Sequence, residues 1–118
     1  MRRSVVIVDD HDAFRQSARA LLELDGFEVV GEAEDGAGAL AVVAETRPDV
    51  VLLDVALPDL SGFDVAERLA GGRSKVVLVS SRDRGDLGPR LKRCGAAGFI
   101  AKDELSGETL GAVLSEAA

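Results

Sequence analysis

The stretch Val50-Val51-Leu52-Leu53-Asp54 decides the fold of this chain. Four branched apolar residues in a row lack the alternation of a strand that has one face in water. They therefore predict a strand buried on both faces, as in a parallel sheet that helices cover on both sides. The run ends in a carboxylate, and ligands bind at the carboxyl edge of open parallel sheets. We therefore consider Asp54 a candidate functional residue.

A second apolar run also ends in acid, because Ser4 to Val8 is followed by Asp9-Asp10. Aspartate is common where a strand gives way to a turn, so Asp54 alone does not define a site. Two acid-ended strands in one short domain, however, predict carboxylates gathered at one edge of the sheet. Such a cluster repels itself unless a hard cation lies within it.

Length, charge and cysteine content narrow the class of protein. The chain has 118 residues, which suits one domain with one core. Its net charge of −7 argues against direct binding to nucleic acid, which needs a basic face. The single cysteine, Cys94, makes no internal disulfide, so we expect a reducing cytoplasm and a buried apolar role for Cys94. We see no signal peptide and no stretch long enough to span a membrane.

Apolar runs and helix-length amphipathic segments alternate along the chain. The pattern predicts strands at residues 4–8, 27–33, 50–54, 75–80 and 99–101, and helices at 13–24, 37–46, 63–70, 86–93 and 106–115. Right-handed crossovers would join them into one doubly wound five-stranded parallel sheet with helices on both faces, an α/β domain over residues 1–118. We expect Leu21 and Ala44 on the buried faces of the first two helices. The helix at 86–93 follows a charged, glycine-rich segment, so we expect it to be short, with Pro89 in its first turn.

Five polar residues would meet at the carboxyl edge of this sheet, since each lies at or just past the end of a strand: Asp9, Asp10, Asp54, Ser80 and Lys102. Mg²⁺ prefers a few carboxylates and retained waters. A carboxylate can also attack phosphorus and form an aspartyl phosphate. The metal and Lys102 would then neutralise the charge of the transferred phosphoryl group.

The constellation resembles the receiver domain of two-component response regulators over essentially the whole chain. The motifs that carry the resemblance are Val8-Asp9-Asp10-His11, Leu53-Asp54-Val55-Ala56-Leu57-Pro58-Asp59-Leu60-Ser61-Gly62, Val79-Ser80-Ser81 and Gly95-Ala96-Ala97-Gly98-Phe99-Ile100-Ala101-Lys102. Each is weak alone, whereas four in the right order and spacing are highly specific. The resemblance implies a flavodoxin-like sheet with strand order 2-1-3-4-5.

The resemblance also implies a role for each acid. Asp54 would accept a phosphoryl group from a sensor histidine kinase. Asp10, Asp54 and the backbone carbonyl of Ala56 would hold Mg²⁺, while Asp9 would act mostly through a bound water. The domain would assist its own phosphorylation and dephosphorylation without being an enzyme.

The remaining residues would link phosphorylation to a change of shape. By resemblance, Lys102 would contact the phosphoryl oxygens, and Ser80 would donate its hydroxyl and move toward the phosphate. Phe99 would be the coupled aromatic that swings inward. A two-state shift would follow at the surface of the fourth helix, fifth strand and fifth helix, where a homodimer could form on phosphorylation.

Residues 31–36, together with Asp10-His11, are most similar to receivers attached to LuxR-type (NarL/FixJ) helix-turn-helix output domains. We find no output domain in this chain. It is therefore either a receiver cut from a longer transcription regulator, which we favour, or a stand-alone receiver. We expect a kinase as partner, and neither direct nucleic-acid binding nor membrane insertion by this domain.

Three other functions share some of these features. A Mg²⁺-dependent phosphohydrolase with an aspartyl nucleophile generally needs a second Asp two residues on, where this chain has Ala56. A flavodoxin-like cofactor binder needs a phosphate-cradling loop after the first strand, where Asp9-Asp10 would repel phosphate. A degenerate receiver would act as an interaction module without phosphorylation. His11, beside the acids, is read as a helix-entry residue rather than a phosphoryl relay.

Overall fold

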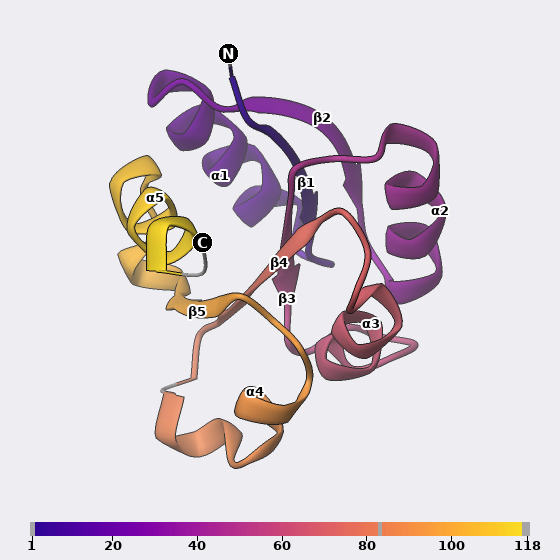
Figure 1. Cartoon of the computed structure of the whole chain (residues 1–118). Coiled ribbons are helices and arrows are strands. Elements are labelled where there is room, and N and C mark those ends of the chain that lie inside the picture. Colours follow the sequence, from indigo (N-terminus) through magenta and orange to yellow (C-terminus); the bar gives the residue numbers. More distant parts are fainter. Residues whose placement is uncertain (1, 83, 117–118) are drawn as a thin grey trace.

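A parallel sheet forms the centre of the molecule in the computed structural model, which describes residues 2–82 and 84–116 (Figure 1). Its strands are β1 (Ser4–Val8), β2 (Glu28–Ala33), β3 (Val50–Asp54), β4 (Lys75–Ser80) and β5 (Gly98–Ala101). They lie in the order β2-β1-β3-β4-β5, and every neighbouring pair is parallel. The predicted doubly wound sheet and its strand order are confirmed.

Helices cover both faces of the sheet (Figure 1). They are α1 (Asp12–Leu24), α2 (Gly36–Thr46), α3 (Gly62–Leu69), α4 (Arg90–Arg93) and α5 (Gly107–Glu116), with 3₁₀ turns η1 (Arg84–Leu87) and η2 (Lys102–Glu104). One core lies between the sheet and α1 and α5, and a second lies between the sheet and α2 and α3. Within the described ranges, no helix is long and apolar enough to cross a bilayer.

The central strand β3 explains why the chain folds this way. All five of its residues are buried, and adjacent side chains enter opposite cores: Val51 and Leu53 join one, and Val50 and Leu52 the other. A strand covered on both sides needs an unbroken apolar run, which the sequence supplies. Only its last residue, Asp54, is charged, so the strand delivers a carboxylate to the edge of the sheet.

Two predicted core positions are wrong. Leu21 is 43% exposed, because Ala18 and Leu22 set the buried stripe of α1 and Leu21 lies a third of a turn away. Ala44 is exposed, because α2 buries Ala39 and Val43 and the next residue turns toward solvent. In both helices the buried face was predicted correctly, but it was extended by one neighbouring residue that turns toward solvent.

The single helix predicted at residues 86–93 is also wrong. The chain forms η1, breaks, and then makes only one turn of helix in α4. The break lies at Gly88, whose φ is +71°, and at Pro89, which has no amide hydrogen to donate. Cys94 is nevertheless buried as predicted, and Leu87 is buried as well. Asp83, within the glycine-rich segment, lies outside the described residues.

Candidate functional site

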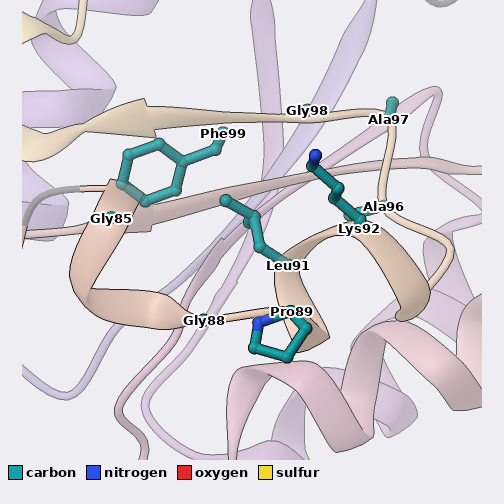
Figure 2. Close-up of a pocket in the computed structure, with 9 residues that line it drawn as sticks. All are labelled: Gly85, Gly88, Pro89, Leu91, Lys92, Ala96, Ala97, Gly98 and Phe99. Atoms are coloured by element: carbon teal, nitrogen blue, oxygen red, sulfur yellow. The ribbon is translucent and has the colours of Figure 1, made fainter.

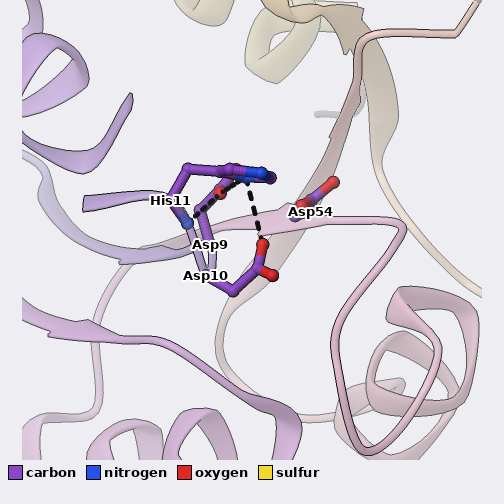
Figure 3. Close-up of side chains that lie close together, drawn as sticks. All are labelled: Asp9, Asp10, His11 and Asp54. Carbon is purple, nitrogen blue, oxygen red and sulfur yellow. Dashed lines mark hydrogen bonds and ion pairs between the residues drawn. The ribbon is translucent and has the colours of Figure 1, made fainter. Parts of the chain in front are cut away.

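Three carboxylates meet at the carboxyl edge of the sheet, as the order of the strands predicts. Val8 and Leu53 are register partners in β1 and β3, so Asp9 and Asp54 leave the sheet at the same level. The Asp9 side chain is fully buried and that of Asp54 is 5% exposed, whereas that of Asp10 is 39% exposed. Figure 3 shows them together with His11. Ligand atoms of these four residues all lie within 4.8 Å of one another.

Lys102 brings a positive charge to this cluster from the end of β5. Its Nζ lies 2.5 Å from Asp9 Oδ2 and 3.5 Å from Asp54 Oδ2. The ammonium also lies 4.5 Å from the centroid of the Phe14 ring, which makes a cation–π contact from α1. Phe14 thereby helps to hold the lysine over the acids.

His11 contacts two of the acids. Its Nδ1 lies 2.9 Å from Asp9 Oδ1 and 3.1 Å from Asp10 Oδ1 (Figure 3). Its backbone N–H donates to Asp9 Oδ1 at 2.8 Å. His11 does precede α1, as predicted, but its side chain caps no helical N–H. Sequence reasoning therefore placed it correctly and missed its contacts.

Arg15 is a site residue that sequence reasoning missed. Its Nη1 donates to the backbone carbonyl of Asp9, and its Nε donates to Glu32 Oε1 at 3.1 Å. Arg19 Nη2 lies 2.8 Å from the other oxygen of Glu32. Two arginines four residues apart, facing an acid on the edge strand, were the available signal. Together they tie α1 to β2 and fix the turn that carries Asp9.

The loop after Asp54 is folded back onto the site. The Ala56 N–H donates to Asp54 Oδ1 at 3.3 Å, and Ala56 also forms a β-bridge with Ser61. Gly62 N–H donates to the Val55 carbonyl at 2.7 Å. A side chain at Gly62 would collide with the backbone of Asp54 and Val55, so this close return of the chain requires glycine.

Ser80 lies beside the acids, because Asp54 and Val79 are register partners and Ser80 is the next residue. It is 5% exposed, and its Oγ accepts the Arg82 N–H at 3.0 Å. Phe99 lies deeper in the sheet, opposite Leu78, and is 7% exposed. The structure therefore brings Ser80 to the carboxyl edge but leaves Phe99 apart from the acids.

A cavity of about 600 Å³ lies beside Phe99, between β5 and the segment around α4 (Figure 2). Its walls are made by Gly85, Gly88, Pro89, Leu91, Lys92, Ala96, Ala97, Gly98 and Phe99. Leu91 and Lys92 reach into it from α4 (Figure 2). The segment around α4 and the buried ring of Phe99 thus line the same cavity.

The surroundings of Asp54 favour its neutral form. Burial raises the pKa of this carboxyl above its ordinary value, and the nearby charge of Asp9 raises it further. Lys102 and the Ala56 N–H oppose the rise in pKa without cancelling it. The folded protein therefore holds a carboxylate that a cation would stabilise strongly.

The donor set fits a hard divalent cation. Carboxylate oxygens predominate, as Mg²⁺ requires, and one of them, on Asp10, is open to water. Asp9 Oδ2 is fully buried and accepts no hydrogen bond from the described residues, with only the Lys102 ammonium against it. Asp9 Oδ2 therefore depends on a neighbouring cation for its compensation, which is expected in a cluster built to hold positive charge.

Fold and cluster together define a doubly wound α/β domain that presents an acid-and-lysine site at the carboxyl edge of its sheet. Residues 5–114 match the response regulator receiver domain family. The chain belongs to that family.

Relatives and solved structures agree with this assignment. The chain is 40% identical over 113 residues to the probable transcriptional regulatory protein NarL of Mycobacterium tuberculosis, covering 93% of this chain and 52% of that protein. It is 38% identical over 101 residues to the response regulator GacA of Pseudomonas aeruginosa, covering 83% of this chain and 47% of that protein. The chain thus spans about half the length of these curated relatives.

The solved signal receiver domain of the M. tuberculosis NarL response regulator superposes with a TM-score of 0.87 at 38% identity, covering 98% of this chain and 96% of that one. A LuxR-family two-component response regulator from Aurantimonas gives the same TM-score at 26% identity, covering 99% of this chain and 86% of that one. Both agree with the similarity to LuxR-type receivers that the sequence motifs indicate.

Proposed function

We propose that this receiver domain accepts a phosphoryl group on Asp54 from a phosphohistidine of a sensor kinase. The P–N bond of the donor breaks as a bond forms between phosphorus and an Asp54 carboxylate oxygen, and the histidine leaves. The observation that carries the proposal is the position of Asp54: a buried carboxylate with a raised pKa, at the sheet edge, within reach of the Lys102 ammonium.

Asp54 is the best acceptor among the three acids. Asp9 is fully buried, with one oxygen against His11 and the other against Lys102. Asp10 is more exposed and lacks a lysine beside it among the described residues. Asp54 combines slight exposure with a raised pKa, which makes its carboxylate a more basic nucleophile than an ordinary aspartate.

In this proposal the metal is Mg²⁺, held by Asp10, Asp54 and the Ala56 carbonyl, with Asp9 acting through a water. When bound, it supplies positive charge that offsets the charge of the phosphoryl oxygens. Lys102 supplies the second positive charge from the end of β5. It contacts both buried acids already, so a phosphoryl group on Asp54 would exchange one anionic partner for another.

The phosphorylated state would reach the surface through Ser80 and Phe99. The Ser80 hydroxyl now accepts a backbone N–H and would turn to donate to the phosphate. Phe99 borders the cavity near α4, which gives neighbouring side chains room to rearrange. The surface of α4, β5 and α5 would then change, and a homodimer could form there on phosphorylation.

The domain would serve as a cytoplasmic signalling module rather than as an enzyme. We propose that it controls transcription through a helix-turn-helix DNA-binding domain in a longer protein. The support is that its curated relatives are described as transcriptional or response regulators and are about twice as long as the matched region.

Intact-protein mass spectrometry after incubation with Mg²⁺ and a small acyl phosphate tests the proposal. We expect one phosphoryl group on the wild type, and none after chelation of the metal or in Asp54→Asn. Asp64→Asn, which changes an exposed acid paired with Arg90, should react like the wild type. Mg²⁺ binding without any phosphoryl gain would contradict the proposal and favour a degenerate receiver that acts by protein contact alone.

A further inference from the structure

Asp59 connects the loop that follows the phosphoryl acceptor to a distant helix. Its Oδ1 accepts the N–H of Gly36 at 2.7 Å, and its Oδ2 accepts the N–H of Ala37 at 3.0 Å. Oδ1 also accepts the N–H of the next residue, Leu60, at 2.8 Å. One side chain thus spans 23 residues of sequence and saturates two N–H groups at the start of α2.

The amino terminus of α2 needs such acceptors. The first-turn N–H groups of a helix have no partner within the helix, and its dipole favours negative charge there. Among the described residues, the side chain of Asp35, the N-cap, accepts only the Gly38 N–H, at 2.7 Å. Asp59, which lies outside the helix, supplies acceptors for the N–H groups of Gly36 and Ala37. The Gly36 N–H and then the Ala37 N–H hold the pKa of Asp59 below its usual value, so the contact is anionic at neutral pH.

The loop also packs closely against the first turn of α2, at Gly36. A Cβ at Gly36 would lie 2.9 Å from both Cβ and Cδ1 of Leu60. Such a distance would force the loop to shift, so glycine at this position lets Leu60 lie directly against the first turn of α2. The hydrogen bonds of Asp59 and the apolar contact of Leu60 therefore act at the same place.

The same loop carries the backbone of the proposed metal site. Its base is closed by the bond from Gly62 N–H to Val55 and by the bridge between Ala56 and Ser61. Its far side is held by Asp59. With both sides fixed, Ala56 has little freedom to move relative to Asp54.

We propose that Asp59 is a positioning residue: by anchoring the loop to α2, it holds Ala56 ready to coordinate the metal beside Asp54. The inference rests on the proposed function, since it concerns the same metal and acceptor. Asp59 touches neither the acids nor Lys102 among the described residues, so it would act only through the loop.

Asp35 provides a matched control, because it is an aspartate at the same helix terminus whose side chain accepts the N–H of Gly38 in its own helix instead of holding the loop. Asp35→Ala and Asp59→Ala remove the same charge and free the same kind of N–H group. We would measure Mg²⁺ affinity by calorimetry and backbone order parameters over residues 56–60 by NMR for both variants. Asp59→Asn, which keeps one acceptor oxygen, should fall between Asp59→Ala and the wild type.

We expect Asp59→Ala to weaken Mg²⁺ binding about fivefold and to lower the order parameters of the loop, as a modest coupling between sites would. Asp35→Ala should leave both quantities within about twofold of the wild type. Equal effects of the two alanine variants, or unchanged binding and order in Asp59→Ala, would overturn the proposal. If the wild type takes no phosphoryl group, the proposed function fails, while these metal and NMR comparisons still decide the role of Asp59.

Discussion

Replacing Gly62 by alanine should destabilise the protein, although the position begins a helix that favours alanine. An added Cβ would lie 2.7 Å from the Cα of Val55 and closer still to the Asp54 carbonyl oxygen. Both are backbone atoms of the strand end and loop, so they cannot move aside as a flexible side chain would. Overpacking of this kind costs about 1 to 3 kcal/mol.

One further effect sets the net change in the free energy of unfolding. Alanine gains up to about 1 kcal/mol over glycine in a helix because the unfolded chain loses freedom. Because the clash is with backbone atoms, the overpacking cost should lie in the upper part of its range, and a net loss of about 1 to 2 kcal/mol should remain. Such a loss lowers the Tm of a domain of this size by about 4 to 8 °C. The displaced loop should also weaken Mg²⁺ binding, since Ala56 would move with it.

Urea unfolding followed by circular dichroism measures the effect, because the chain has no tryptophan. Gly111→Ala is the matched control: it lies within α5, and an added Cβ there meets nothing within 4 Å. We expect Gly111→Ala to raise the free energy of unfolding and Gly62→Ala to lower it. A Gly62→Ala variant as stable as Gly111→Ala would refute the packing argument.

Three other outcomes follow from the site and its supports. Asp54→Asn should stabilise the metal-free protein at neutral pH. Because folding raises the pKa of Asp54, the free energy of unfolding of the wild type falls as the pH rises from the ordinary pKa of aspartate through the raised pKa. Urea unfolding should therefore show that the variant is more stable than the wild type at neutral pH and that this difference disappears in acid. Mg²⁺ should raise the free energy of unfolding by about 2.7 kcal/mol at a hundred times its Kd, and Asp10→Asn should lose that response in thermal melts. Asp25→Ala, which frees the Gly107 N–H at the start of α5, should cost about 1 kcal/mol in urea unfolding, whereas Glu28→Ala on the edge strand should cost less than about 0.5.

The strands were predictable because burial on both faces leaves a strong pattern. Val50 to Leu53 had to be apolar without interruption, and the polar residue that ended the run had to lie at the edge. Asp9 and Lys102 followed by the same reasoning, since parallel strands bring their carboxyl ends together. The meeting of the acids therefore needed no tertiary information beyond a parallel topology, whereas the strand order was implied by the resemblance to receiver domains.

Other features depended on contacts that no local pattern records. Arg15 binds the backbone carbonyl of Asp9, and Asp59 binds backbone N–H groups of α2, more than 20 residues away in sequence. Backbone groups carry no sequence signature, so neither contact could be predicted. The prediction of one helix after β4 failed for a local reason instead. Gly88 adopts a left-handed φ, which ends the turn η1 before α4 begins. The apolar spacing of Leu87 and Leu91 predicts a continuous helix, and the sequence pattern does not show that Gly88 interrupts it.

The central claim is that Asp54, and not a neighbouring acid, carries the phosphoryl group. Borohydride reduces an acyl phosphate to an alcohol, so treating the phosphorylated protein would convert the modified aspartate to homoserine. Peptide mass mapping would then locate the change. We predict homoserine at position 54 alone, in amounts that follow the phosphoryl gain of the intact protein. Homoserine at position 9 or 10, or none in protein that has gained a phosphoryl group, would contradict the account.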